Sequence, residues 1–156
     1  MVRHAIRRFL LKKTWIVILG VLLLVFIWSQ SVAPVAQSAK ESRWLTENVI
    51  NPILHRVGLD AVEDRVVRKM AHVTEFFLLS VVMAQLWGGN VLRTVYTGFT
   101  VAFLDESIQL LSRRGALIAD VWIDMIGVTL GTLVGCLLWE FFQWVKRRKS
   151  GRRSRR

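Results

Sequence analysis

The sequence predicts an all-α membrane protein, a bundle of four transmembrane helices with an outer interfacial segment. The first observation is composition, because 53% of the 156 residues are hydrophobic and only 21% are charged, which is too apolar for a soluble domain. The length fits one domain covering residues 1–156. The second observation is a set of apolar runs of roughly membrane-spanning length, at about residues 9–28, 70–87, 93–111 and 117–145.

The net charge of +11 is concentrated at the two ends of the chain. Thirteen of the 22 lysines and arginines precede the first apolar run or follow the last, and the body between them has 9 basic and 11 acidic residues. Basic ends that flank apolar runs are typical of topology signals and of anchors for anionic lipid head groups. Nucleic-acid binding is not expected, because no aromatic residue interleaves the basic run from Lys146 onward. Membrane lipids are therefore the expected partners.

The first apolar run, residues 9–28, favours an uncleaved membrane anchor. Its charged start and the small residues after it also resemble a signal peptide, so cleavage stays open. Residues 29–68 form a polar extracytoplasmic loop with two prolines. Within this loop, apolar residues from Trp44 to Val57 recur at helical spacing, which predicts an interfacial helix or cap on the outer surface.

The positive-inside rule predicts the topology of the bundle. Gly88, Gly89 and Asn90 form the inner turn, and residues 112–115 form the outer one. Both termini are expected to be cytoplasmic, with residues 146–156 as a basic tail, in a bacterial cytoplasmic (inner) membrane. The arginines in the outer turn are an exception to the rule, and we expect nearby acids to hold them.

In this topology nearly every ionisable residue of the body falls near the outer surface, on three different spans. Charges scattered at helix ends would favour neither side. Acids within a membrane are costly, need partners and usually mark a functional site. The candidate polar site therefore comprises Lys69, His72, Glu75, Asp105, Glu106, Gln109, Arg114, Asp120 and Asp124.

The last span presents a face of small residues below its acids. At about 100° per residue, Asp120 and Asp124 share one face with Gly127, Gly131 and Gly135. Glycines at this spacing let a neighbouring helix approach closely. We expect them to pack the acids of the last span against that neighbour.

Two interpretations of the polar site remain open: an ion-pair network that only locks the helices together, or a functional polar pocket. His72 is compatible with a proton carrier, a metal ligand or a hydrogen-bonded residue at a helix end. The chain contains no zinc motif such as H-E-x-x-H and no nucleophile elbow, so we expect no metal, no cofactor and no serine hydrolase. Cys136, the single cysteine, is expected to be a packing residue.

These motifs resemble the VanZ family over about Trp15 to Gly135. The similar runs are Lys69-x-x-His72-x-x-Glu75, Asp105-Glu106-x-x-Gln109, then Arg114 and Asp120-x-x-x-Asp124-x-x-Gly127, with Trp28-Ser29-Gln30-Ser31 similar to the family's Ser-rich stretch. Phe76 stands where a tyrosine is frequent. The usual Pro-Gly before the arginine is missing, so the choice between Arg113 and Arg114 stays open.

The family is named for a membrane protein linked to low-level resistance to teicoplanin, an antibiotic that acts at the cell wall. The resemblance implies a role at the cell envelope. One hypothesis is a module that binds an envelope lipid or a cell-wall precursor. Another is a membrane enzyme that acts on such a lipid by acid–base chemistry, with its catalytic residues unassigned. A transporter would require a homo-oligomer, because four spans are few for that function.

Overall fold

The computed structural model describes residues 2–112 and 118–153, and every regular element in this part of the chain is helical. The all-α prediction is thereby confirmed. The helices are α1 (Val2–Val32), α2 (Val35–Leu45), the π-helical turn η1 (Thr46–Ile50), α3 (Asn51–Arg56), α4 (Asp64–Leu86), α5 (Val91–Leu111) and α6 (Ile118–Arg153). Helix α1 extends beyond its apolar run at both ends, α4 begins before its run and α6 continues past its run, because polar and basic residues continue these helices.

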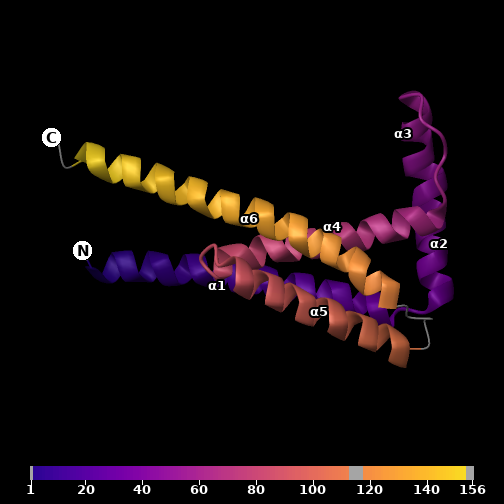
Figure 1. Cartoon of the computed structure of the whole chain (residues 1–156), viewed down its shortest axis with the longest axis horizontal. Coiled ribbons are helices and arrows are strands. Elements are labelled where there is room, and N and C mark those ends of the chain that lie inside the picture. Colours follow the sequence, from indigo (N-terminus) through magenta and orange to yellow (C-terminus); the bar gives the residue numbers. More distant parts are fainter. Residues whose placement is uncertain (1, 113–117, 154–156) are drawn as a thin grey trace.

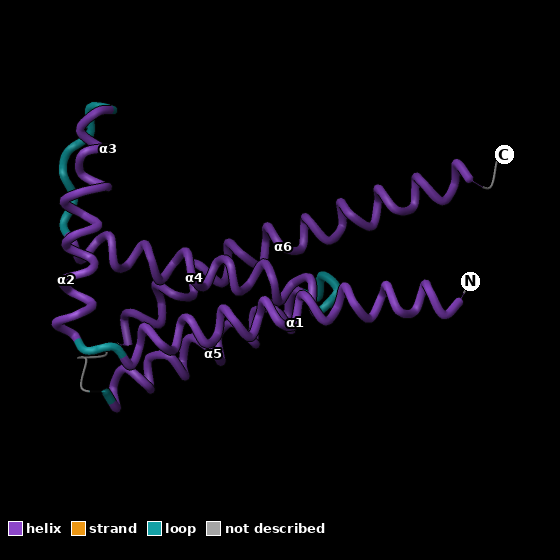
Figure 2. The backbone as a smooth tube through the Cα atoms, turned by 180° about the vertical axis from the view of Figure 1, so that it is seen from behind, coloured by secondary structure: helices purple, strands orange, loops and turns teal. Residues whose placement is uncertain are grey.

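The four long helices run lengthwise together, with both chain termini at one end of the bundle (Figure 1). Helix α6 packs most extensively along α4 and also contacts α5, while α1 packs on α4 and α5. The short helices α2 and α3 stand across the opposite end (Figure 2). The bundle therefore has a terminus side and an opposite side that carries the short helices.

We call residues 35–56, from α2 through η1 to α3, the cap. It begins after Pro34, earlier than the helix that the sequence predicted from Trp44. The π-helical turn interrupts it and is followed directly by α3. The Asn51 side chain bonds the backbone of Val62 in both directions, at 2.9 and 3.3 Å, and so fastens the chain that returns to α4.

The predicted turn between α4 and α5 is present. Gly88 and Gly89 have φ values of +66° and +77°, a region that favours glycine because it lacks a Cβ atom. The Asn90 side chain then caps α5 by accepting a hydrogen bond of 2.9 Å from the Arg93 N–H. Local sequence therefore determines this turn.

The glycine stripe of α6 lies directly against the backbone of α4. A Cβ atom at Gly127 would collide with the Val73 carbonyl, and one at Gly131 would collide with the Phe77 backbone. At Gly135 it would lie 2.6 Å from the Ala84 Cβ. These glycines thus allow the two helices to approach more closely than any side chain would permit.

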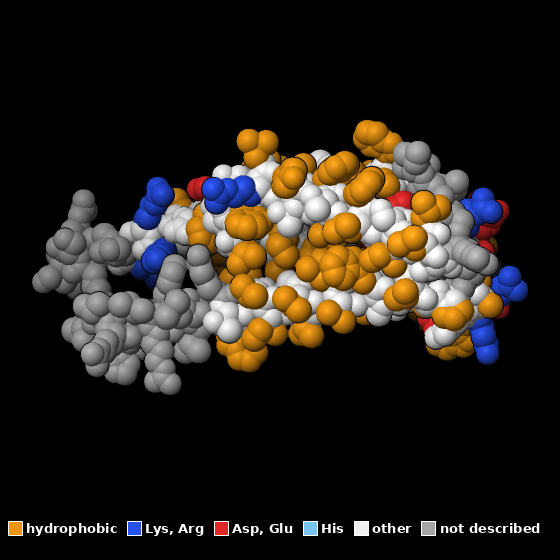
Figure 3. All heavy atoms as spheres, turned by 90° about the horizontal axis from the view of Figure 1, so that it is seen from below, with side chains coloured by type: hydrophobic (Ala, Val, Ile, Leu, Met, Phe, Trp, Pro, Cys, Tyr) orange, Lys and Arg blue, Asp and Glu red, His pale blue; other side chains and the backbone are white. Residues whose placement is uncertain are grey.

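Beside its buried apolar core, the bundle buries several ionisable side chains and exposes many large apolar ones. Buried positions include charged Asp105, Glu106 and Asp124, whereas Leu92 and Leu111 are 82% and 85% exposed. Apolar side chains cover much of the bundle surface in Figure 3. This distribution is that of a surface in contact with lipid.

Two segments are long and apolar enough to cross a membrane, Thr14–Val32 in α1 and Asp120–Lys149 in α6. Helices α4 and α5 are not among them, because their ionisable and polar residues lower their mean hydropathy. The all-helical prediction is therefore confirmed, and two of the four apolar runs are candidate membrane spans by length and composition.

Candidate functional site

The cap-side half of the α4–α6 interface is charged. Lys69 and His72 lie on one face of α4 because they are three residues apart, and they meet the acids at the start of α6. The Lys69 Nζ lies 3.8 Å from an Asp120 oxygen, and the His72 Nδ1 lies 3.8 Å from an Asp124 oxygen. Glu75, one turn further along α4, places a carboxylate oxygen 3.9 Å from the same His72 nitrogen.

Helix α5 contributes Asp105, which is completely buried. The Ser31 hydroxyl of α1 donates to one of its oxygens in a short hydrogen bond. The Gln109 amide, one turn along α5, donates to the other oxygen at 2.9 Å. The two donors orient the Asp105 carboxylate and tie α1 to α5.

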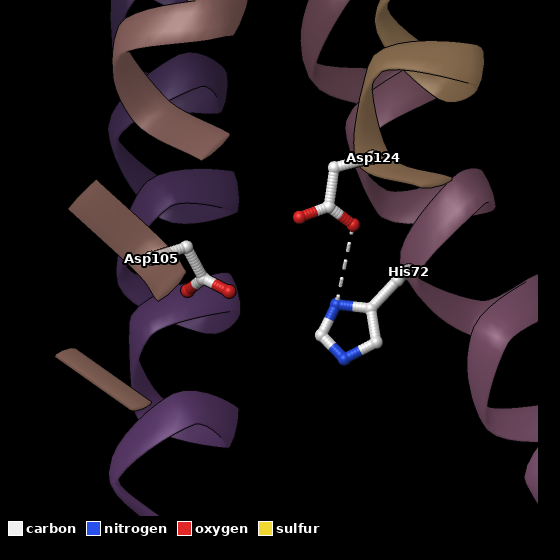
Figure 4. Close-up of side chains that lie close together, drawn as sticks. All are labelled: His72, Asp105 and Asp124. Carbon is white, nitrogen blue, oxygen red and sulfur yellow. Dashed lines mark ion pairs between the residues drawn. The ribbon is translucent and has the colours of Figure 1, made fainter. Parts of the chain in front are cut away.

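His72, Asp105 and Asp124 come together from three different helices. Their nearest nitrogen and oxygen atoms all lie within 4.8 Å of one another. Figure 4 shows the Asp124 carboxylate next to the imidazole and the Asp105 carboxylate across the space between the helices. We call these three residues, with Glu75, the polar cluster.

The polar cluster carries an excess of negative charge. Asp105, Glu106, Asp120 and Glu75 all lie close enough to Asp124 to repel its charge. In the described residues, the lysine and arginine ion pairs are those of Lys69 with Asp120 and of Arg68 with Asp64. The arrangement therefore suits a positively charged or proton-carrying group at its centre.

A pocket of about 230 Å³ lies between the end of α1, the cap and the first turns of α4. His72 and Glu75 belong both to its wall and to the polar cluster. Its other polar lining comes from Gln30 of α1, Ser38, Glu41 and Ser42 of α2, and Arg68 of α4. The pocket thus connects the buried cluster with the surface next to the cap.

Most residues of the predicted polar site meet at this one end of the bundle. Lys69, His72, Glu75, Asp105, Gln109, Asp120 and Asp124 are linked by the contacts described above. Glu106 is 8% exposed and acts electrostatically on Asp124. Arg114 and Arg113 lie outside the described residues.

Sequence reasoning missed two parts of this site. Ser31 had entered only as part of a Ser-rich stretch, and that stretch was the available signal for its role. The pocket wall formed by the cap had no signal, because Ser38 and Glu41 look like ordinary exposed residues of a polar helix. Only the position of the cap across the bundle brings them to the site.

Comparison with known proteins gives one positive result. Neither the curated proteins nor the solved structures contain a match to this chain. The model of the VanZ/LLP1 family, in contrast, matches residues 14–143, which is most of the chain and includes all three motifs. The resemblance inferred from those motifs is confirmed, and the chain belongs to the VanZ/LLP1 family of membrane proteins.

Proposed function

We propose that this VanZ-family protein spans the membrane four times, with α1, α4, α5 and α6. Helices α4 and α5 have 23 and 21 residues, and at about 1.5 Å per residue each covers a hydrocarbon core of about 30 Å. Among their acids, Asp105 and Glu106 are buried and the Glu75 side chain is only 17% exposed, so these groups are largely shielded from lipid. Exposed apolar residues such as Phe99 and Phe103 cover the outside of α5.

We further propose that both termini are cytoplasmic and that the cap lies on the outer surface. The two basic ends of the sequence are on the same side of the bundle, as the positive-inside rule requires (Figure 1). The cap exposes Trp44 and Ile53, and Val57 directly after it is also exposed, which suits a segment lying in the interface between lipid and water. Cysteine labelling of Leu59→Cys in a Cys136→Ser background tests this orientation, and labelling only from the cytoplasmic side would reject it.

The pocket beneath the cap supports a binding function at the envelope. We propose that it holds the head group of an envelope lipid or of a lipid-linked cell-wall precursor. The observation that carries this proposal is the continuity of the 230 Å³ pocket with His72 and Glu75. Arg68 and Glu41 give its wall both signs of charge, which suits a head group that has both a phosphate and an amine.

A substitution that fills the pocket tests the binding function. Ser38→Trp places an indole in the wall, whereas Lys40→Trp places the same side chain on an exposed part of α2 outside the pocket. Binding of a short-chain lipid-linked precursor, and of a short-chain phosphatidylethanolamine, is measured by native mass spectrometry of the full-length protein. We expect about a tenfold loss with Ser38→Trp only, which corresponds to about 1.4 kcal/mol. Equal binding by both variants would reject the pocket as the binding site.

The same proposal makes an expectation for whole cells. A module that binds a cell-wall precursor changes the access of a glycopeptide antibiotic to that precursor. We expect expression of the protein in a susceptible strain to raise the inhibitory concentration of teicoplanin, and Ser38→Trp to abolish the increase. An unchanged inhibitory concentration on expression would separate this chain from glycopeptide resistance.

A second candidate function is acid–base catalysis on such a lipid. It is favoured by one observation, the position of the His72 imidazole between two carboxylates in the pocket wall. This function requires turnover of a lipid or precursor that disappears in His72→Gln and persists in His55→Gln, whose histidine is exposed on α3. Equal turnover in the two variants would exclude His72 as the catalytic group.

A further inference from the structure

We propose that the polar cluster is a binding site for a divalent transition-metal ion, with His72, Asp105 and Asp124 as ligands and Glu75 as a fourth donor. This site goes beyond the head-group function and does not depend on it. Four observations support the proposed site. They are the distances between the donor atoms, the burial of the Asp124 carboxylate, the excess of carboxylates over cations, and the hydrogen bonds that orient Asp105.

The spacing of the donor atoms fits an ion with a small closing movement. The donors of His72, Asp105 and Asp124 lie within 4.8 Å of one another. Two ligands on opposite sides of an ion, with bonds of about 2.1 Å, are about 4.2 Å apart. Small side-chain rotations that move the donor atoms by a fraction of an ångström would therefore bring all three within bonding distance of one ion. Figure 4 shows that the imidazole and both carboxylates already face a common space.

Asp124 provides an independent indication of a ligand. Its side chain is only 3% exposed, and the contact that the structure gives its carboxylate is the ion pair with His72 at 3.8 Å. That distance is beyond hydrogen-bonding range. A carboxylate that is buried next to the charges of Asp105, Glu106, Asp120 and Glu75 is costly, and a cation in the space that it faces lowers that cost.

The excess of carboxylates over cations in the polar cluster also favours a bound metal ion. Among the side chains that the structure describes, those of residues 14–34, 36–112 and 120–149, no lysine or arginine makes an ion pair with Asp105, Asp124 or Glu75. His72, even when protonated, supplies one positive charge against three carboxylates. A divalent ion supplies two charges and binds neutral imidazole, so it neutralises the cluster more completely.

Two hydrogen bonds orient the Asp105 carboxylate in the way that metal-ligating carboxylates are usually oriented. Ser31 and Gln109 each donate to one of its oxygens, and each oxygen retains a further lone pair. Such partners fix the orientation of a ligating carboxylate. A set of one imidazole and several carboxylates suits Mn²⁺ or Zn²⁺ better than Ca²⁺ or Mg²⁺, which prefer oxygen alone.

The proposal revises the expectation of no metal that the sequence supported. That expectation rested on the missing H-E-x-x-H motif, which places two ligands on one helix. Here the ligands come from α4, α5 and α6, so no short sequence pattern marks them. The pocket provides a route for the ion, because His72 and Glu75 form part of its wall.

Metal titration of the untagged full-length protein in detergent tests the site. After treatment with a chelator, Mn²⁺ is added and its free form is followed by electron paramagnetic resonance, with Zn²⁺ as a competitor. We expect one Mn²⁺ per chain, displaced by Zn²⁺. Failure of the wild-type protein to bind either ion at millimolar concentration would overturn the proposal.

Matched variants assign the ion to the cluster. His72→Gln and Asp124→Asn should each weaken binding at least about tenfold, whereas His55→Gln and Asp60→Asn, at exposed positions, should leave it unchanged. His72→Gln remains informative even if Asp124→Asn does not fold, because the imidazole is 26% exposed. Equal weakening by the control variants would reject the assignment. Ser38→Trp should retain Mn²⁺, which keeps this test separate from that of the head-group pocket.

Discussion

The interface between α4 and α6 has two halves that are built on opposite principles. On the terminus side, Gly127 and Gly131 place the backbone of α6 directly on that of α4. On the cap side, the same helices face each other through Lys69 and Asp120, and through His72 and Asp124, at 3.8 Å. Close packing of small residues holds membrane helices together, since lipid provides no hydrophobic drive for their association. The glycine half thus provides the stability of the pair, and the charged half is available for function.

The largest loss of stability is expected when a side chain is introduced at a glycine of the α4–α6 interface. Gly131→Val introduces a Cβ that collides with the Phe77 backbone, which cannot move as a side-chain tip does. Because α4 and α6 must separate, we expect a loss of about 3 kcal/mol in stability, measured as the shift in thermal unfolding in detergent.

Thr129→Val is the control for this substitution, because Thr129 is exposed on the same helix. It should unfold at nearly the wild-type temperature. If Gly131→Val also does so, close packing of the glycines does not stabilise the interface, and the comparison between the two halves fails.

An intermediate effect is expected at the contact between α1 and α5. Ser31→Ala removes one of the two donors to the buried Asp105 carboxylate, and we expect a loss of about 1–3 kcal/mol in thermal unfolding. The matched control is Ser29→Ala, whose exposed hydroxyl donates only to the Phe26 carbonyl of its own helix. A smaller effect of Ser31→Ala than of Ser29→Ala would show that Asp105 is satisfied without α1.

The smallest effect is expected in the charged half. The Lys69 and Asp120 side chains are 47% and 37% exposed, so screening leaves their ion pair worth roughly 0–1 kcal/mol. Lys69→Met should therefore shift thermal unfolding little, and Asp120→Asn should do the same. A loss above about 2 kcal/mol in either variant would mean that the charged half also carries stability.

Local patterns predicted the parts of the fold that depend on local chemistry. Apolar runs located the long helices, and Gly88-Gly89-Asn90 located the turn, because positive φ angles and a helix cap have residue signatures. The predicted positions of the helix ends were less accurate. Helix α4 begins at Asp64 rather than near residue 70, since polar residues continue a helix without any change of period.

The site was predictable only where its residues are unusual for their surroundings. Acids and a histidine in apolar helices are costly, so Asp105, His72 and Asp124 were identifiable from the sequence. Ser31 was not assigned a role, because a serine near a helix end is common and only its contact with Asp105 gives it one. The pocket depends on the angle between the cap and the bundle, which no local pattern encodes.

The polar cluster also constrains how the protein is made. In the proposed four-span topology its members would enter the membrane one after another, because His72 and Glu75 precede Asp105 and finally Asp124 in the chain, and Ser31, which donates to Asp105, precedes them all. A chain that lacks α6 leaves His72 and Asp105 without their third member, and a chain with α1 undocked leaves Asp105 with Gln109 as its donor and without Ser31. The cost of an unsatisfied acid in lipid then falls on every incomplete intermediate. The polar cluster is therefore complete only after α6, the last helix of the chain, has joined the bundle.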